Sequence, residues 1–140
     1  MPQSLSVADA QPGIFTDNQQ GSGQGKIFHA DLVTEANPAA PVSAGDTVVI
    51  YCSGLGAVSP GVDAGSPAPS VEPLARTVNT VTASIGGLNA HVVFAGLTPG
   101  FAGLYQVNVE VPAGVTPGDS VPVSLTVAGQ SSPVVTMAVR

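Results

Sequence analysis

Two side chains with metal-binding and acid–base chemistry stand close together near the N-terminus. His29 and Asp31 are two residues apart, and in an extended strand residues at this spacing share one face. A zinc site needs three or four ligands, and His91, the only other histidine, alternates with Ala90 and Val92 and is expected on a solvent face. We predict that the chain has no metal site. The candidate ligands for one are His29 and Asp31. The plainer interpretation is that both side chains hydrogen-bond to backbone at a strand end.

The other reactive groups form no catalytic pattern. Gly21–Lys26 looks like a phosphate loop, but position 20 is not Gly and position 27 is neither Ser nor Thr, as that motif requires. Cys52 shares an apolar face with Val48 and Ile50, which favours a buried, inert thiol over a nucleophile. Lys26 is the only lysine and so the only residue that could form an isopeptide bond, but its place beside a Gly-rich turn argues against a dry amine. We predict a non-enzymatic chain without a cofactor.

The carboxylates are spaced for turns more than for catalysis. Asp46 and Asp119 each follow a glycine, where an aspartate commonly accepts backbone N–H groups. Glu35, Asp63 and Glu72 fall in expected loops. They could join a calcium site, although the chain lacks the spacing of an EF-hand loop.

Aromatic side chains are the usual platforms of sugar-binding β proteins, and here they are few. The chain has no Trp, and aromatic residues are 4% of it. Tyr105 falls on a valine-rich strand face, while Phe101 stands between glycine and alanine in an expected loop. Phe101 either projects from this loop or plugs the end of the core. We predict a ligand or partner surface that contains Phe101, Tyr51, Asp63 and Glu72.

Length and composition limit the functional class further. A chain of 140 residues forms one domain with a real core. Its net charge is −6, and its three basic residues are scattered along the sequence, which argues against nucleic-acid binding. The apolar stretches are shorter than the ~18 residues of a spanning helix, so we predict no membrane insertion. The first residues do not read as a signal peptide, and a single cysteine leaves the compartment open.

Alternation with a period of two predicts an all-β chain. Leu104–Val111 and Ser120–Val127 each place valines on one face and polar residues on the other, and Val135–Val139 forms a last strand. Thr47–Cys52 is apolar on both faces, which predicts a central strand. The expected core residues are Ile14, Ile50, Ile85, Phe94, Tyr105, Val107, Val109 and Leu125.

Glycine and proline mark the connections. Val81–Ile85 and Ala90–Phe94 flank a Gly-rich turn and read as a hairpin. Ala44–Val48 and Pro117–Val121 share a Gly-Asp turn pattern, and the second has the Pro-Gly pair of a type II turn. Residues 56–77 lack a strand pattern, and we predict one long loop there, of a length that is usually functional or mobile.

Three stretches of this sequence resemble the IPT/TIG class of immunoglobulin-like domains: Ala44–Gly56, Ile85–Val92 and Val111–Val115. A broader likeness covers nearly the whole chain. The sequence resembles the C-terminal domain of unknown function found in large exported proteins of soil acidobacteria (Solibacter-type). The residues that carry it are Pro12–Thr16, His29–Asp31, Ala36–Pro38, Tyr51 with Gly54–Gly56, Phe94–Phe101, Gly103–Val109 and Val139–Arg140.

These likenesses imply an immunoglobulin-like, IPT/TIG-like β-sandwich with long Pro/Gly-rich loops, although alternation alone does not separate a sandwich from a small barrel. We expect a single module over residues 1–140, with N-terminal strands in 1–34, the IPT/TIG-like part in 35–140 and the long loop at about 56–77. The resemblance implies that the native protein continues upstream of residue 1 and that this bacterial module is secreted or displayed at the cell surface.

We predict that the chain is a non-catalytic accessory or interaction module at the C-terminus of an exported bacterial protein. Its partners would be upstream domains of the parent protein, or a protein or polysaccharide of the cell surface. One alternative is a carbohydrate-binding module that assists an upstream enzyme. Another is a small metal-dependent enzyme that uses His29 and Asp31, with His91 as a further candidate ligand.

Overall fold

The regular structure of this chain consists of β-strands, as the alternation predicts. The computed structural model describes residues 12–19, 23–59, 61, 68, 74–101 and 104–140, and none of them is helical. None of the described residues therefore belongs to a helix that could cross a membrane. The strands are β1 Gly13–Ile14, β2 Ile27–His29, β3 Thr47–Ser53, β4 Val58–Ser59, β5 Arg76–Thr77, β6 Val81–Ile85, β7 Leu88–Leu97, β8 Tyr105–Glu110, β9 Gly118–Val127, β10 Gln130–Ser131 and β11 Val135–Val139.

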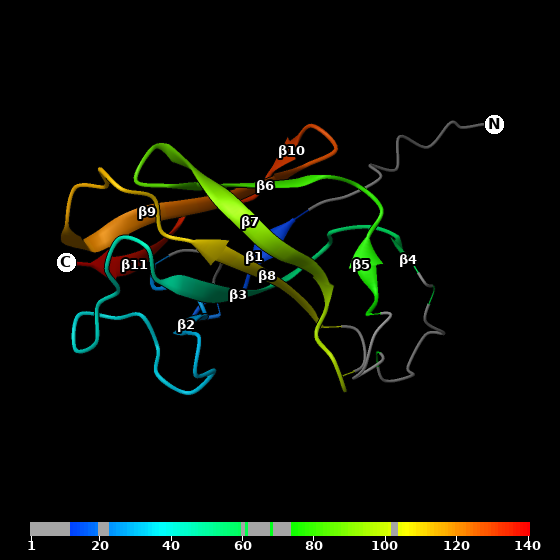
Figure 1. Ribbon diagram of the computed structural model, residues 1–140, viewed down its shortest axis with the longest axis horizontal. Helices are drawn as coiled ribbons and strands as arrows, with labels where there is room; N and C mark the ends of the chain where they lie inside the picture. The colour runs from blue at the N-terminus through cyan, green and yellow to red at the C-terminus, as the bar shows by residue number, and fades with distance from the viewer. Residues whose placement is uncertain (1–11, 20–22, 60, 62–67, 69–73, 102–103) are drawn as a thin grey trace.

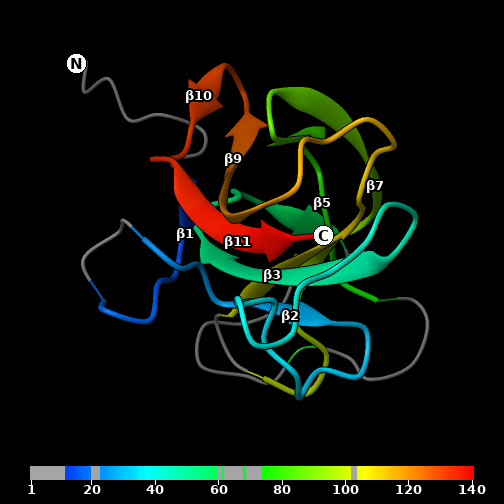
Figure 2. The same cartoon turned by 90° about the vertical axis from the view of Figure 1, so that its left-hand side faces the viewer.

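The strands form one curled antiparallel sheet with the shape of a half-barrel (Figures 1 and 2). The main path runs β1-β3-β8-β7-β6-β9-β10. Strand β2 also pairs with β3, strand β11 pairs with β9, and the short β4–β5 pair joins the sheet through β7. Strand β3 has β8 on one edge and both β1 and β2 on the other. The prediction that Thr47–Cys52 is central is confirmed.

The free edge of β11 is covered by N-terminal segments. Val42 and Val139 form a parallel bridge, and so do Gln24 and Thr136. The backbone N–H of Arg140 donates to the carbonyl of Val42 at 2.9 Å. These contacts give the edge hydrogen-bond partners, which protects it from pairing with another chain.

The core is aliphatic. Six of the eight predicted core residues are buried: Ile14, Ile50, Ile85, Val107, Val109 and Leu125. Tyr105 is half-buried against the core, and its hydroxyl donates to the carbonyl oxygen of Gly56 at 2.6 Å. The fully buried members of the main cluster include no Phe or Tyr among the described residues. The described aromatic side chains therefore all reach the surface to some degree.

The prediction that Phe94 is a core residue is wrong. The pairing of β7 with β8 shifts register between Val92 and Phe94, so that Phe94 lies opposite Asn108. A bulge adds one residue to a strand and moves the following side chains to the opposite face. Phe94 is therefore half-buried on the outer face, where the guanidinium of Arg76 lies 5.4 Å from the centroid of its ring.

The β6–β7 hairpin turn is confirmed. Its two central residues, Gly86 and Gly87, have φ of 62° and 82°, the positive values that a two-residue hairpin turn requires. Strand β7 already begins at Leu88. The turn is therefore shorter than the four positions, 86–89, that lie between the two predicted strands.

The two Gly-Asp turns have different structures despite their similar sequences. At the first, Gly45 has φ 89°, the Asp46 N–H donates to the Ser43 carbonyl, and the Asp46 carboxylate accepts the Ser43 N–H at 2.8 Å. The predicted type II turn at Pro117-Gly118 is wrong. Gly118 has no positive φ and opens strand β9 opposite Val139, and Asp119 lies within that strand. Pairing with β11 extends the backbone there and overrides the local turn preference.

The long loop predicted over residues 56–77 is wrong at both ends, where the chain forms short strands. Val58 pairs with Thr77, and Ser59 pairs with Arg76. Within the segment, Ala68 forms a parallel bridge with Pro99. Positions 60, 62–67 and 69–73 lie outside the described residues.

Candidate functional site

A cleft of about 870 Å³ lies on the outer side of the sheet where β1, β2 and β3 meet the turn before β8. Tyr51 and Ser53 reach it because they alternate with the core residues Ile50 and Cys52 along β3. Four of the six aromatic residues of the chain line this cleft. The lining residues are Gly13, Ile14, Phe15, Thr16, Gln19, Lys26, Phe28, Tyr51, Ser53, Phe101 and Leu104.

Backbone hydrogen bonds at Tyr51 fix one wall of the cleft. The Phe15 N–H donates to the Tyr51 carbonyl at 3.1 Å, and the Tyr51 N–H donates to the Lys26 carbonyl at 3.1 Å. The Lys26 N–H donates in turn to the Phe15 carbonyl at 2.7 Å. The rings of Phe28 and Tyr51 meet edge to face, with centroids 5.7 Å apart and planes at 71°. The three strands thus hold their aromatic side chains in fixed relative positions.

Phe101 is presented to the cleft by a tight turn. The Phe101 N–H donates to the Thr98 carbonyl at 3.1 Å, and Gly100 has φ 81°. With Pro99 before that glycine, these are the features of a type II turn. Ala68 accepts the Gly100 N–H and donates to the Phe101 carbonyl, both at 3.0 Å.

The side chain of Phe101 is 58% exposed. The alternative that Phe101 plugs the core is therefore wrong, and the alternative that it projects from the loop is confirmed. Exposing a large apolar side chain to water costs free energy. Because a hydrogen-bonded turn holds Phe101 in water, contact of its ring with a ligand is favoured.

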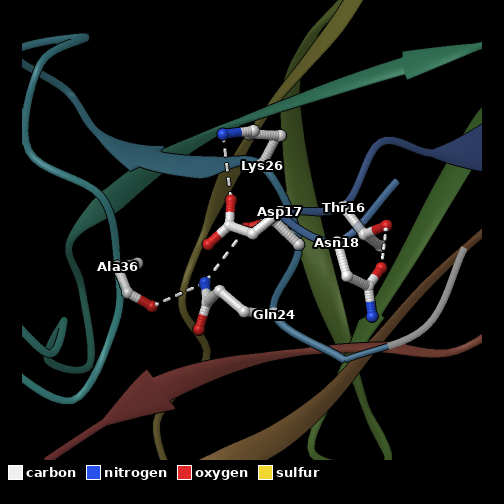
Figure 3. Close-up of polar contacts among 7 residues, drawn as sticks. Thr16, Asp17, Asn18, Gln24, Lys26 and Ala36 are labelled. Carbon is white, nitrogen blue, oxygen red and sulfur yellow. Dashed lines mark hydrogen bonds and ion pairs between the residues drawn. The ribbon is translucent and has the colours of Figure 1, made fainter. Parts of the chain in front are cut away.

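A charged cluster borders the cleft at Lys26. The Lys26 ammonium lies 3.0 Å from Asp17 Oδ1, and the two side chains are 43% and 39% exposed (Figure 3). The hydrogen bond and charge of Asp17 raise the pKa of Lys26 against a smaller opposing effect of burial. Gln24 lies beside this pair and donates to the Ala36 carbonyl at 3.1 Å (Figure 3).

Glu35 and Asp17 are hydrogen-bonded to one another, and their pKa values are shifted in opposite directions. Burial raises the pKa of Glu35, and the hydrogen bond and charge of Asp17 add to this effect. Burial opposes a lowered pKa at Asp17, but hydrogen bonds with Glu35 and Lys26 and the charge of Lys26 outweigh it. Asp17 is therefore the group that ionises first, and Glu35 keeps its proton to a higher pH.

His29 and Asp31 are engaged with neighbouring groups. Strand β2 ends at His29, whose Nε2 lies 2.7 Å from the Ala40 carbonyl oxygen. Asp31 stands in the following turn and accepts the N–H groups of Val33 and Thr34, both at 2.9 Å, and the Thr34 hydroxyl at 2.7 Å. These bonds lower the pKa of Asp31 to about 2.

The expectation that His29 and Asp31 share a strand face is wrong, because the strand stops between them. Their bonds agree with the plainer interpretation of backbone hydrogen bonding. Within the described parts of the chain, no three His, Cys, Asp or Glu side chains are grouped for a metal ion. His91 is exposed on β7, as predicted.

The other expected site residues are Cys52, Tyr51, Asp63, Glu72 and Phe101. Cys52 is buried, and burial raises the pKa of its thiol to about 12, so it is held protonated and unreactive. Burial also raises the pKa of Tyr51. Asp63 and Glu72 lie outside the described residues. Of the predicted surface, the structure brings Phe101 and Tyr51 together in the cleft.

Sequence reasoning missed Phe15 and Phe28. Each directly adjoins a core isoleucine, Ile14 or Ile27, so alternation already places it on the outer face. What the sequence did not reveal is that β1 and β2 pair with the same edge of β3, which brings both phenylalanines beside Tyr51.

Comparisons of the chain with protein-family models, with curated proteins and with solved structures each give no match.

Proposed function

We propose that this chain is a non-catalytic accessory module that binds a protein partner by taking an apolar side chain into the aromatic cleft. The observation that carries the proposal is the convergence of Phe15, Phe28, Tyr51 and Phe101 on one hollow of about 870 Å³. That volume lies within the usual range of ligand sites, and such sites are typically apolar with a few polar groups at defined places.

The chemistry of the walls favours an apolar side chain over a sugar. Three of the four aromatic residues are Phe, and Ile14 and Leu104 complete the apolar lining. A sugar hydroxyl placed against phenyl and aliphatic groups loses its water without gaining a partner, which is costly. An alkyl or aromatic side chain in the same place gains about 25 cal/mol for each Å² removed from water.

Carbohydrate binding is the second candidate. The observation that favours it is the presence of a hydroxyl and an amide group among the cleft residues, at Ser53 and Gln19. These groups could bind sugar hydroxyls at the rim while a pyranose ring stacks on Phe101 or Tyr51.

The proposed setting is a bacterial protein that is exported or displayed at the cell surface, with this module at its C-terminal end. The resemblance to the acidobacterial C-terminal domain and to the IPT/TIG class supports this part of the proposal. The proposal also includes an immunoglobulin-like sandwich as the fold. The Gly45 turn that leads into β3 and the Gly86-Gly87 hairpin support it. An experimental structure that lacks two facing sheets would remove the sandwich and leave the cleft unaffected.

Nuclear magnetic resonance with two probes tests the binding function. N-acetylphenylalanine amide at millimolar concentration is expected to shift backbone resonances around Phe28, Tyr51 and Phe101, and cellohexaose is expected to shift none. Phe101→Ala should weaken the effect of the first probe by about tenfold, since an aromatic anchor contributes on the order of 1–2 kcal/mol. The free energy of unfolding of the Phe101→Ala variant should differ from that of the parent chain by less than about 0.5 kcal/mol, as is usual for exposed sites.

Val134→Ala is the matched control. Val134 is 57% exposed, almost the same as Phe101, and it does not line the cleft. It should bind the probe like the parent chain. Shifts that map elsewhere, or that survive Phe101→Ala unchanged, contradict the proposal, and shifts with cellohexaose alone would replace it by the carbohydrate candidate.

A further inference from the structure

Lys26 gives the aromatic cleft a preference for charge. It is the only charged residue among the described residues that line the cleft, and it is the only lysine of a chain with a net charge of −6. The other two cations of the chain lie elsewhere. Arg76 lies over Phe94, and the Arg140 guanidinium donates to Ser43 at 3.2 Å. The cleft thus combines an apolar lining with a cation at its border.

The ammonium group of Lys26 has hydrogen-bonding capacity beyond Asp17. An ammonium carries three N–H donors, and the ion pair with Asp17 Oδ1 at 3.0 Å uses one of them. The side chain is 43% exposed, so a second acceptor can approach from the solvent side. A carboxylate is the acceptor that gains most, because the hydrogen bond is then charge-assisted on both partners.

The position of Lys26 in the chain places its side chain beside the aromatic rings. Asp17 pairs with Lys26, and burial together with Asp17 raises the pKa of the neighbouring Glu35. The Lys26 backbone is fixed between Phe15 and Tyr51, so its side chain extends from the same strand positions as the aromatic rings. An apolar side chain seated among the rings would therefore carry its sequence neighbours close to the ammonium group.

We infer that the cleft recognises a peptide segment in which a large apolar residue stands next to an acidic one, with Lys26 as the partner of the acidic side chain. This inference rests on the proposed function and specifies the chemistry of the protein partner. Lys26 is then the residue that determines specificity, while the aromatic side chains supply most of the affinity.

A matched pair of blocked tetrapeptides tests the inference on the whole chain. One is acetyl-Gly-Phe-Asp-Gly-amide and the other is its Asn counterpart, which has the same shape without the charge. Titrations followed by nuclear magnetic resonance should give about threefold to fivefold tighter binding of the Asp peptide at low salt, the range expected of a partly exposed ion pair. The preference should shrink as salt is added, because salt screens exposed charges.

Three variants separate the charge effect from the cleft itself. Lys26→Met should abolish the preference, so that the Asp and Asn peptides bind this variant with equal affinity. Lys26→Arg should retain the preference, and Asp17→Asn should enlarge it, because the ammonium then loses the carboxylate that pairs with it at 3.0 Å. A preserved thermal transition in each variant shows that the fold is intact.

The possible failures are distinguishable. If both peptides bind the parent chain equally, or if Lys26→Met keeps the preference, the charge inference is wrong and the proposed function stands. If neither peptide shifts the resonances of the cleft, the proposed function falls together with the inference.

Discussion

The interior of this protein and its aromatic cleft use different side chains. The buried cluster is built from Val, Ile, Leu, Ala and Met with one Cys, whereas four of the six aromatic residues line a hollow on the outer face. The two regions share strand β3, where Ile50 and Cys52 point inward while Tyr51 and Ser53 line the cleft. One strand therefore contributes to stability through one face and to the candidate site through the other.

The four aromatic side chains of the cleft lie outside the buried cluster. Aliphatic side chains fill the inside of the curled sheet. Phe101 at 58% exposure and Phe15 at 44% keep about half of their surface in water in the isolated chain. Mutations in the two regions should accordingly separate stability from binding.

The largest effect is expected from truncation of the core. Leu125 is fully buried on β9, and Leu125→Ala should lower the free energy of unfolding by about 2–5 kcal/mol, because it removes apolar contacts and leaves a cavity. Urea unfolding measures this loss, with the exposed Val134→Ala as the comparison. Equal losses in the two variants would contradict the proposed division between core and surface.

A smaller effect is expected at the turn that presents Phe101. Gly100 has φ 81°, and Gly100→Ala should cost about 1–2 kcal/mol because a Cβ is strained in that conformation. The same variant should weaken binding of N-acetylphenylalanine amide, since the turn positions the Phe101 ring. If binding is unchanged while stability falls, the turn supports the fold alone.

The smallest effect is expected from the pH dependence of Glu35 beside the cleft. Its pKa is raised in the folded chain by burial and by Asp17, so folding favours the neutral form. This contribution is complete below the unfolded-state pKa and is lost as the pH rises through the raised folded-state pKa.

Glu35→Gln keeps the side chain neutral and should flatten this part of the stability profile. Urea midpoints measured from about pH 4 to 8 test the effect, because carboxyl groups with raised pKa values titrate in that range. The lowered pKa of Asp17 acts in the opposite sense and at lower pH. A profile that is identical in the parent chain and in Glu35→Gln would show that Glu35 does not contribute.

Alternation predicted the strands well, because a sheet with one buried face imposes a period of two on the sequence. It failed at Phe94, where a bulge changes the face without any break in the apolar pattern. It also failed at Gly118, where a turn-like sequence is extended by pairing with β11. Both errors arise from partners that are remote in sequence.

The candidate site was predictable only in part. The position of Phe101 between glycine and alanine left open whether its ring projects or plugs the core, and the exposure of the ring decides for projection. His29 and Asp31 have suitable residue types, but the end of β2 and the turn at Asp31 commit them to local hydrogen bonds. Residue type alone did not show which acceptor each group would find.

The β structure, the aliphatic core strands and the glycine turns at Gly45 and Gly86-Gly87 follow from the sequence, since they depend on neighbours along the chain. The shared edge of β3, where β1 and β2 both pair and which the Phe101 turn reaches, follows from the folded arrangement alone. Four aromatic side chains from separate segments become one cleft through that pairing. Which strands pair depends on packing across the whole sheet, and no local spacing encodes it.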